Sequence, residues 1–244
     1  MINKNDVVAW IREYFAENGP NAKAVIGISG GKDSTIAAAL CVEALGADRV
    51  IGVRMPQGTQ KDIQDAYDVC DILGIASYEI NIGETCKDLY KQLDINLIDP
   101  SNPIIQTNTP ARIRMTTLYA VAAAVNGRVC CTSNRSEAFV GYSTKWGDNI
   151  GDFAPLRGLT VTEVYQLGVQ LNLPGRLVAK DPADGMSGKT DEENLGFSYY
   201  DVDNFINGKY EKISDGLLFT KILKRYHESR HKRSKIPCYI KRSN

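Results

Sequence analysis

One stretch decides the fold of this chain: Ala24-Val25-Ile26-Gly27-Ile28-Ser29-Gly30-Gly31-Lys32-Asp33-Ser34. Its apolar first half predicts a short buried strand, its centre a turn, and the residues after it a helix. Paired glycines let the backbone approach a ligand, and the amides at a helix N-terminus attract negative charge, so this arrangement is typical of a phosphate site. The plainer interpretation is an ordinary strand-to-helix turn in which Asp33 or Ser34 caps the helix.

The polar side chains of this turn favour the phosphate interpretation. Ser29 and Ser34 add hydroxyl donors on both sides of the glycines. Asp33 would repel a phosphate unless a cation lay between them, and Mg²⁺ is commonly held by one or two carboxylates together with phosphate oxygens. The turn therefore predicts a nucleotide phosphate site with a magnesium ion.

Composition bounds the class of protein. The 244 residues are 43% hydrophobic and 24% charged, as in a globular domain with a large core, and 29 basic residues balance 29 acidic ones. No net field steers the chain onto nucleic acid or a membrane, and no signal core or run of 18 apolar residues is present, so we expect a cytoplasmic protein.

Six cysteines without C-x-x-C spacing favour free thiols over zinc or disulfides. With only His227 and His231, histidine-based metal sites and Ser-His-Asp triads are disfavoured.

Strand patterns alternate with helix patterns along the chain, which predicts one α/β domain over residues 1–244. We expect a doubly wound, mostly parallel five-stranded sheet flanked by helices, whose ligands lie beyond the carboxyl ends of the strands. The phosphate turn, Met55-Pro56 and residues 132–137 would then share one edge. The expected strands are 24–28, 49–54, 77–82 and 128–132. The expected helices are 5–18, 35–45, 59–73, 84–93, 110–124, 160–171, 198–206 and 214–233.

Several segments between these elements carry candidate functional groups. Arg112 and Arg114 fall in the first turn of the helix expected to start at Asn108-Thr109-Pro110, where cations are unfavourable, so they serve a ligand or partner unless they are merely solvated. Residues 142–152 form a long polar loop, which is more often functional than filler. Residues 181–191 have the composition of a mobile lid. Gly188-Lys189-Thr190 imitates the end of a Walker A loop, but the first glycine is missing and no strand precedes it, so we reject a P-loop.

The phosphate turn, read as Ser29-Gly30-Gly31-x-Asp33-Ser34, resembles the pyrophosphate loop of the ATP-pyrophosphatase superfamily. That superfamily includes NAD synthetases, GMP synthetases, argininosuccinate synthetases and tRNA-modifying enzymes. Further motifs in order and at the right spacing resemble ammonia-dependent NAD synthetases over nearly the whole chain. These motifs are Arg54-Met55-Pro56-x-Gly58-Thr59-Gln60-x-Asp62, Ala111-Arg112-x-Arg114-Met115, Thr132-x4-Glu137, Lys145-x-Gly147-Asp148, Pro155-Leu156-x-Gly158-Leu159-Thr160, Asp191-Glu192-x2-Leu195-Gly196 and His231-Lys232-Arg233-x3-Pro237.

The resemblance implies an adenine nucleotide alpha-hydrolase-like fold and a ligase. Nicotinate adenine dinucleotide (deamido-NAD), ATP and ammonia would give NAD, AMP and pyrophosphate through an acyl-adenylate, the last step of NAD biosynthesis. A carboxylate is a poor electrophile, so it must be activated before an amide forms, and the protein mainly positions reactants and neutralises charge. No side-chain nucleophile is needed, which agrees with the scarcity of histidine.

The resemblance also implies roles for individual residues. Asp33 and Glu137 would be catalytic and would hold Mg²⁺. The ATP site would comprise Gly27, Ile28, Ser29, Gly30, Gly31, Lys32, Asp33, Ser34 and Thr132, with Lys32 at the variable position of the motif and able to face solvent. The deamido-NAD site would comprise Arg112, Lys145, Asp152, His231 and Lys232. A second subunit completes this site in the family, which implies a homodimer.

Two positions depart from the family's pattern. Val161 replaces a lysine that often contacts ATP, and Ala183 replaces a lid threonine or serine. We expect Lys180 or Lys189 to supply the missing charge. Glutamine-using relatives carry an additional N-terminal glutaminase domain, whereas about two dozen residues precede the phosphate strand here, so we expect free ammonia as the nitrogen source.

Three alternatives remain open from the residues alone. A tRNA thiolase would need a reactive cysteine pair, and Cys130-Cys131 is adjacent, although its apolar setting favours core packing. A GMP-synthetase-like amidotransferase would need further domains. A nucleotide sensor that has lost catalysis would agree with Val161 and Ala183, but the carboxylates Asp33 and Glu137 argue against it.

Overall fold

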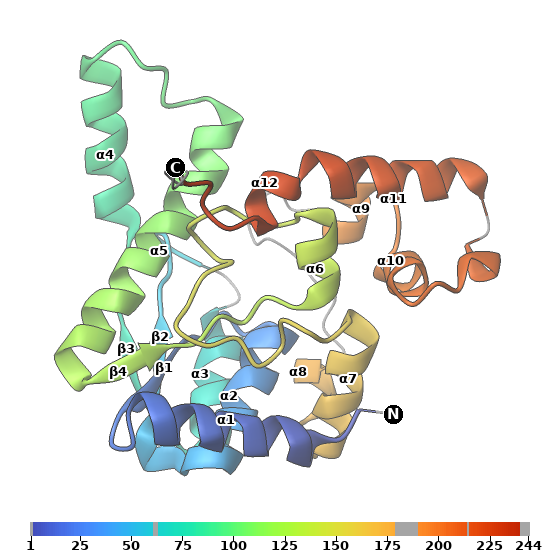
Figure 1. The fold of residues 1–244 in the computed structure, drawn as a ribbon. Coiled ribbons are helices and arrows are strands. Elements are labelled where there is room, and N and C mark those ends of the chain that lie inside the picture. The colour runs from blue at the N-terminus through green and yellow to red at the C-terminus, as the bar shows by residue number, and fades with distance from the viewer. Residues whose placement is uncertain (1, 61–62, 179–189, 214, 240–244) are drawn as a thin grey trace, which may run out of the picture.

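The structure is a computed structural model, and it describes residues 2–60, 63–178, 190–213 and 215–239. These residues form a parallel sheet with helices on both faces and a further group of helices at the carboxyl end of the chain (Figure 1). The strands are β1 (Lys23–Gly27), β2 (Val50–Arg54), β3 (Ala76–Glu79) and β4 (Gly127–Val129). The helices are α1 (Lys4–Asn18), α2 (Lys32–Leu45), α3 (Ile63–Leu73), α4 (Gly83–Ile95), α5 (Pro103–Val125), α6 (Arg135–Val140), α7 (Val161–Gln170), α8 (Gly175–Val178), α9 (Asp191–Leu195), α10 (Tyr199–Ile206), α11 (Gly216–Glu228) and α12 (Arg230–Arg233), with short 3-10 turns η1 (Ala47–Arg49) and η2 (Tyr210–Lys212).

The sheet has the order β3-β2-β1-β4, and every pairing between neighbours is parallel. The α/β, doubly wound fold is therefore as predicted, but the prediction of five strands was wrong for the described residues. Where a fifth strand would lie, Phe153 forms only a single parallel bridge with Cys130. Pro155 follows two residues later, and a proline has no N–H with which to continue such a ladder.

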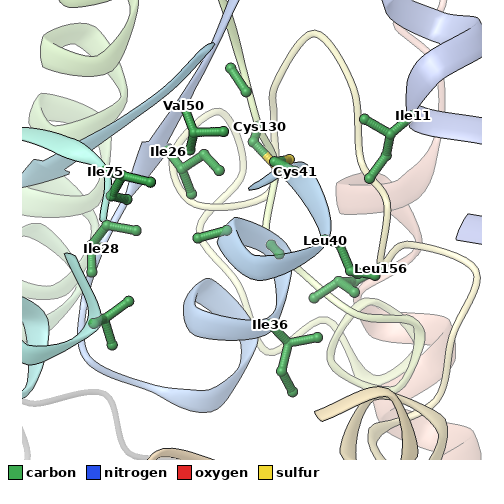
Figure 2. Close-up of a cluster of buried hydrophobic side chains, with 14 of the residues drawn as sticks. Ile11, Ile26, Ile28, Ile36, Leu40, Cys41, Val50, Ile75, Cys130 and Leu156 are labelled. Atoms are coloured by element: carbon green, nitrogen blue, oxygen red, sulfur yellow. The ribbon is translucent and has the colours of Figure 1, made fainter. Parts of the chain in front are cut away.

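Two hydrophobic clusters cover the two faces of the sheet. The first includes Ile26 from β1, Ile36 and Leu40 from α2, and Ile11 from α1, and it extends to Leu156 (Figure 2). The second packs Val25 of β1 against Met115 and other residues of α5. Alternate residues of β1 thus enter opposite cores, which explains its unbroken apolar sequence.

A third cluster gathers α6, α10 and α11 around Tyr199, Val202 and Ile222. It builds the group of helices that lies at one end of the molecule in Figure 1. The single helix expected over 214–233 was wrong: the structure divides it at Ser229, which ends α11 and precedes α12.

Helix α5 begins at Pro103 and contains Pro110 in its interior, so the expected start at Asn108-Thr109-Pro110 was wrong. Asn102 accepts a hydrogen bond from the amide of Ile104, and Pro103 lies in the first turn, so this earlier pair supplies the N-cap and the helix start. Arg112 and Arg114 therefore lie well inside the helix, not in its first turn, so the helix dipole does not disfavour them as predicted.

Candidate active site

The site lies where the strand order reverses, because β1 is flanked by β2 on one side and β4 on the other. In open parallel sheets, ligands bind beyond the carboxyl ends of the strands at such a switch point. The turns after β1 and β4 meet there: Asn134 Nδ2 donates to Asp33 Oδ1 over 3.2 Å. The prediction that residues 29–34 and 132–137 share one edge is confirmed for this pair of turns.

Hydrogen bonds between residues of the phosphate turn define its conformation. Ser34 Oγ donates to the carbonyl of Gly31 at 3.1 Å, lies 3.1 Å from Ser29 Oγ, and accepts from the amide of Ser29 at 3.3 Å. Thr35 Oγ1 also donates to the Gly31 carbonyl, at 2.8 Å. The serines thus shape the turn as well as offering hydroxyl groups to a ligand.

Two glycines meet specific demands of this turn. Gly30 has a φ of +79°, and a Cβ there would lie 2.7 Å from Asp65 Cβ. Gly31 occupies the N-cap position of α2, and no side chain accepts a capping hydrogen bond there. The interpretation of Asp33 or Ser34 as the N-cap was therefore wrong. The first amides of a helix have no intrahelical partner, so α2 presents N–H groups at this turn.

The remaining members of the loop contribute through the backbone. Gly27 ends β1, and Ile28 is a buried core residue whose amide donates to the Val53 carbonyl at 2.9 Å. Thr132 is half-buried and follows the end of β4, two residues before Asn134. These positions agree with a nucleotide site along this edge of the sheet.

Asp33 and Glu137 are brought together by Asn134. The side chain of Asn134 accepts from the Glu137 amide at 3.0 Å while Glu137 Oε2 accepts from the Asn134 amide at 3.2 Å, a reciprocal cap of α6. Burial and the charge of Asp33 raise the pKa of Glu137 to about 8, and Lys32 partly opposes this rise. Two carboxylates that repel each other in an enclosed position are a suitable place for a cation.

These two carboxylates fit magnesium better than a transition metal. The residues that the structure describes contain no group of three or more His, Cys, Asp or Glu side chains arranged to hold a metal. Mg²⁺ uses hard oxygen ligands and usually completes its shell with water and substrate phosphates, so two protein carboxylates beside a phosphate turn suit it.

Lys32 is buried, which contradicts the expectation that it can face solvent. The residue is 5% exposed, and its ammonium lies 2.6 Å from Asp33 Oδ2. Burial alone would lower its pKa, but Asp33 and Glu137 reverse the effect, so the pKa is raised. In this chain, the variable position of the motif therefore carries a buried ammonium group that is paired with Asp33.

The lid and the replacements for the missing lysine fall outside the described residues. This applies to Lys180, Ala183, Lys189 and all of 181–191 except its last two residues. Thr190 and Asp191 are described, with Thr190 capping α9. Val161 is the first residue of α7, and its amide donates to Ser136 Oγ at 3.1 Å.

The predicted dinucleotide residues lie within the segment 141–152 or on the helices α5 and α12 that contact it. Arg112 Nε donates to the backbone carbonyl of Lys145 at 3.2 Å, which places Arg112 against the chain at Lys145. Lys232 Nζ donates to the carbonyls of Gly141 and Ser143 at 2.8 and 2.7 Å. His231 is exposed on α12 beside Lys232, and its Nδ1 lies 3.2 Å from the Glu228 carbonyl. Lys232 is thus already engaged with backbone oxygens, which the sequence did not indicate.

Asp152 lies at the other end of this segment, on a cavity of about 340 Å³. Its Oδ2 accepts from the Val129 amide at 2.7 Å, and Tyr119 donates to Oδ1 at 3.4 Å. The cavity is also lined by Trp10, Tyr14, Cys131, Asn149, Ile150, Gly151, Phe153, Ala154 and Arg157. Trp10 and Tyr14 are unexpected in this lining, because in the sequence they appear only as apolar positions of the amphipathic helix over 5–18.

The adjacent cysteines pack in the core, as the sequence predicted. Cys130 is 3% and Cys131 4% exposed, and Cys130 lies beside Cys41 in the first cluster (Figure 2). Burial raises the pKa of both thiols, so neither is readily ionised to the reactive thiolate. This disfavours the thiolase alternative.

The sequence and the fold of this chain are both similar to those of known proteins. The sequence profile of the NAD synthase family matches residues 3–237. An NH(3)-dependent NAD(+) synthetase from Thermococcus sibiricus is 41% identical over 82% of this chain and 77% of its own. The NMN synthetase of Francisella tularensis superposes with a TM-score of 0.86 at 29% identity, covering 98% and 99% of the two chains. The NH3-dependent NAD synthetase of Campylobacter jejuni superposes with a TM-score of 0.78 at 26% identity, covering 98% and 100%. This chain belongs to the NAD synthase family.

Proposed function

We propose that this chain is a ligase that converts deamido-NAD to NAD with ammonia, at the cost of ATP cleaved to AMP and pyrophosphate. The single observation that carries the proposal is the bond between Asn134 and Asp33. It joins the phosphate turn after β1 to the helix that bears Glu137, so an anion site and two carboxylates share one edge of the sheet. The family match and the NAD synthetases among its relatives agree with this activity.

The reaction needs the chain to place two anionic substrates against each other. The amides of the phosphate turn bind the ATP phosphates, while the nicotinate carboxylate oxygen attacks the α-phosphorus and pyrophosphate leaves. Ammonia then attacks the acyl carbon, AMP leaves, and the nitrogen loses a proton. The residues act by orientation and charge neutralisation, which is how phosphoryl and acyl transfers are commonly accelerated.

Asp33 and Glu137 would hold Mg²⁺ in this mechanism. The ion, when bound, supplies positive charge against the phosphate oxygens during attack. The protein's own contribution is the capping of α6 by Asn134, which fixes Glu137, and the turn at Gly31, which fixes Asp33.

Arg112 and Lys145 are proposed to bind the dinucleotide, with Lys232 and His231 on α12 completing its site. The dinucleotide carries two phosphates and a carboxylate, so several cations around one loop match its charge. Asp152 and the aromatic walls of its cavity suit a heteroaromatic ring and a ribose hydroxyl. A homodimer with this site at the interface is part of the proposal, supported by the exposure of Arg112, Trp146 and His231.

No helix in the described part of the chain is long and apolar enough to span a bilayer. We place the enzyme in the cytoplasm because five of its six cysteines are buried thiols, which suit a reducing compartment.

The test is product formation by the purified chain. With deamido-NAD, ATP, Mg²⁺ and ammonium, NAD, AMP and pyrophosphate should accumulate in equal amounts. Leaving out either deamido-NAD or ammonium should stop NAD formation. Equal rates with glutamine in place of ammonium would contradict the proposed nitrogen source, and the absence of NAD would refute the function.

A second candidate substrate is the nicotinate mononucleotide. It is favoured by one observation, the TM-score of 0.86 with the Francisella tularensis NMN synthetase. The discriminating measurement is kcat/KM for the two nucleotides under the same conditions. A higher value for the dinucleotide supports the first proposal, and a higher value for the mononucleotide replaces it.

A further inference from the structure

Arg157 has a buried N–H group that makes no hydrogen bond. Its Nη1 atom is shielded from solvent, and no acceptor among the residues that the structure describes lies within hydrogen-bond distance of it. A buried donor without an acceptor destabilises a folded chain, and the effect is larger when the donor belongs to a charged group. Packing alone therefore does not explain an arginine at this position, and each such group in a folded protein calls for a role.

The backbone holds Arg157 in a defined place beside a cavity. Its amide donates to the carbonyl of Ala154 at 3.2 Å, and the preceding residue, Leu156, is fully buried in the first cluster. The side chain of Arg157 lines the same cavity of about 340 Å³ as Asp152. A rotation of the side chain is thus sufficient to direct the guanidinium at a molecule bound there.

The charges around Arg157 leave this cation without a counterion from the cavity wall. Among the described residues of the lining, the acidic one is Asp152, and its oxygens already accept from the Val129 amide at 2.7 Å and from Tyr119 at 3.4 Å. A second cation also lies close by: burial lowers the pKa of Arg233, and the positive charge of Arg157 adds to that shift. The surplus of positive charge favours an anion in this place.

The opposite wall of the cavity is aromatic. The ring centroids of Trp10 and Tyr14 are 6.1 Å apart, those of Tyr14 and Phe153 are 5.2 Å apart, and both pairs are stacked. Pockets for small molecules commonly combine such apolar faces with a few directed polar groups. A molecule with a heteroaromatic ring and an anionic group close to it, such as a nucleotide, matches both features.

We propose that Arg157 is a specificity-determining residue that binds an oxyanion, a phosphate or a carboxylate, of the nucleotide substrate in this cavity. This inference deepens the proposed function and rests on it. The planar guanidinium donates two parallel hydrogen bonds to either kind of group, which an ammonium does not. Binding of the substrate then supplies the acceptor that the buried N–H group lacks.

The first test measures nucleotide binding by calorimetry without ATP, so that no reaction takes place. Arg157→Met should weaken the binding of deamido-NAD about 10- to 100-fold, as expected for the loss of a charged hydrogen bond. Arg157→Lys should recover only part of the affinity, because it keeps the charge but not the fork. Unchanged affinity in Arg157→Met would overturn the inference.

A comparison with NAD identifies the bound group, because NAD has the same phosphates as deamido-NAD but an amide in place of the carboxylate. Equal losses for the two dinucleotides in Arg157→Met assign Arg157 to a phosphate, and a loss for deamido-NAD alone assigns it to the carboxylate. The matched control is Arg49→Met. It removes a half-buried arginine bonded to the Ala22 carbonyl at 3.1 and 2.8 Å, away from the cavity lining, and it should bind both dinucleotides like the wild type.

The second test measures thermal unfolding without nucleotide. Arg157→Met removes no side-chain hydrogen bond of Nη1, so its unfolding midpoint should equal or exceed that of the wild type. Arg49→Met removes two hydrogen bonds and should unfold at a lower temperature. A lower midpoint in Arg157→Met together with unchanged affinity would show a purely structural role and contradict the inference.

Sedimentation velocity tests whether a second copy of the chain satisfies Arg157 instead. Wild type and Arg157→Met should have the same oligomeric state, and weaker self-association of the variant with undiminished nucleotide binding would overturn the inference. None of these measurements requires amide formation. Binding that depends on Arg157 but leads to no NAD with ATP and ammonium would refute the proposed reaction alone, whereas NAD formation with equal affinities in wild type and Arg157→Met would refute this inference alone.

Discussion

Asn134 links two turns that are 101 residues apart by donating from Nδ2 to Asp33 Oδ1 at 3.2 Å. The same side chain caps α6 by accepting from the Glu137 amide, and Asn134 is fully buried. One amide side chain therefore serves the stability of a helix and the position of both proposed metal ligands.

Replacing Asn134 by alanine should lower the free energy of unfolding by about 1–3 kcal/mol, because a cap and a buried hydrogen bond are lost together. The KM for ATP should rise as well, since Asp33 loses a neighbour that orients it. Chemical denaturation and steady-state kinetics measure the two effects. The control is Thr190→Ala, which removes the equivalent cap of α9 but not the link to Asp33. A purely structural role would leave the KM for ATP unchanged.

Glu137→Gln should lower kcat by about 100-fold or more, because several kcal/mol of metal-based charge stabilisation are lost. The substitution keeps the shape of the side chain, and an amide oxygen can still accept the bond from the Asn134 backbone. We therefore expect the folded structure to persist by circular dichroism. Activity within tenfold of the wild type at saturating Mg²⁺ would exclude Glu137 as a metal ligand.

Gly30→Ala should destabilise the phosphate turn by about 1–3 kcal/mol, since a non-glycine residue is strained at a φ of +79°. The added Cβ would also lie 3.0 Å from the Ala66 backbone nitrogen and force the turn away from α3. Gly46→Ala is the matched control, with a φ of +86° but nothing within 4 Å of the added atom. A larger loss of ATP affinity in Gly30→Ala than in Gly46→Ala is the expected result, and equal affinities would contradict it.

Arg112→Ala should raise the KM for deamido-NAD about 10- to 100-fold with little change in the KM for ATP, because one charged hydrogen bond to the dinucleotide is lost. Arg12→Ala is a suitable control, as Arg12 is an exposed arginine bonded to the carbonyls of Glu43 and Ala44. If the KM for ATP rises instead, Arg112 has been assigned to the wrong substrate.

Asp203→Ala tests a network that lies behind the site. Asp203 accepts from Ser136 Oγ at 2.5 Å and from the amide and hydroxyl of Thr162 at 2.8 and 2.6 Å. Its removal leaves the buried Ser136 hydroxyl and the part-buried Thr162 donors without this acceptor, and we expect a loss of about 2–4 kcal/mol in unfolding free energy. The kcat of the remaining folded enzyme should stay close to that of the wild type. A stable but inactive variant would instead give Asp203 a role in catalysis.

The sequence by itself determined the parallel α/β fold and the phosphate turn. Both are encoded locally, in the unbroken apolar run of β1 and in the glycines and serines that follow it. The order of motifs along the chain also identified the family. The fold class and the turn depend on neighbouring residues, so periodicity and turn chemistry were sufficient to find them.

Only the tertiary structure decided the environment of each charged group. Lys32 was expected to face solvent because it fills a variable position, but it is buried and its ammonium lies 2.6 Å from Asp33 Oδ2. The charges of Asp33, Glu137 of α6 and Asp191 of α9 raise the pKa of Lys32 against the effect of burial. Likewise, α5 starts where Asn102 caps it. In place of the predicted fifth strand, Phe153 forms a single bridge with Cys130 just before Pro155. Burial and charge pairing arise between residues far apart in the chain, and local patterns contain no information about such distances.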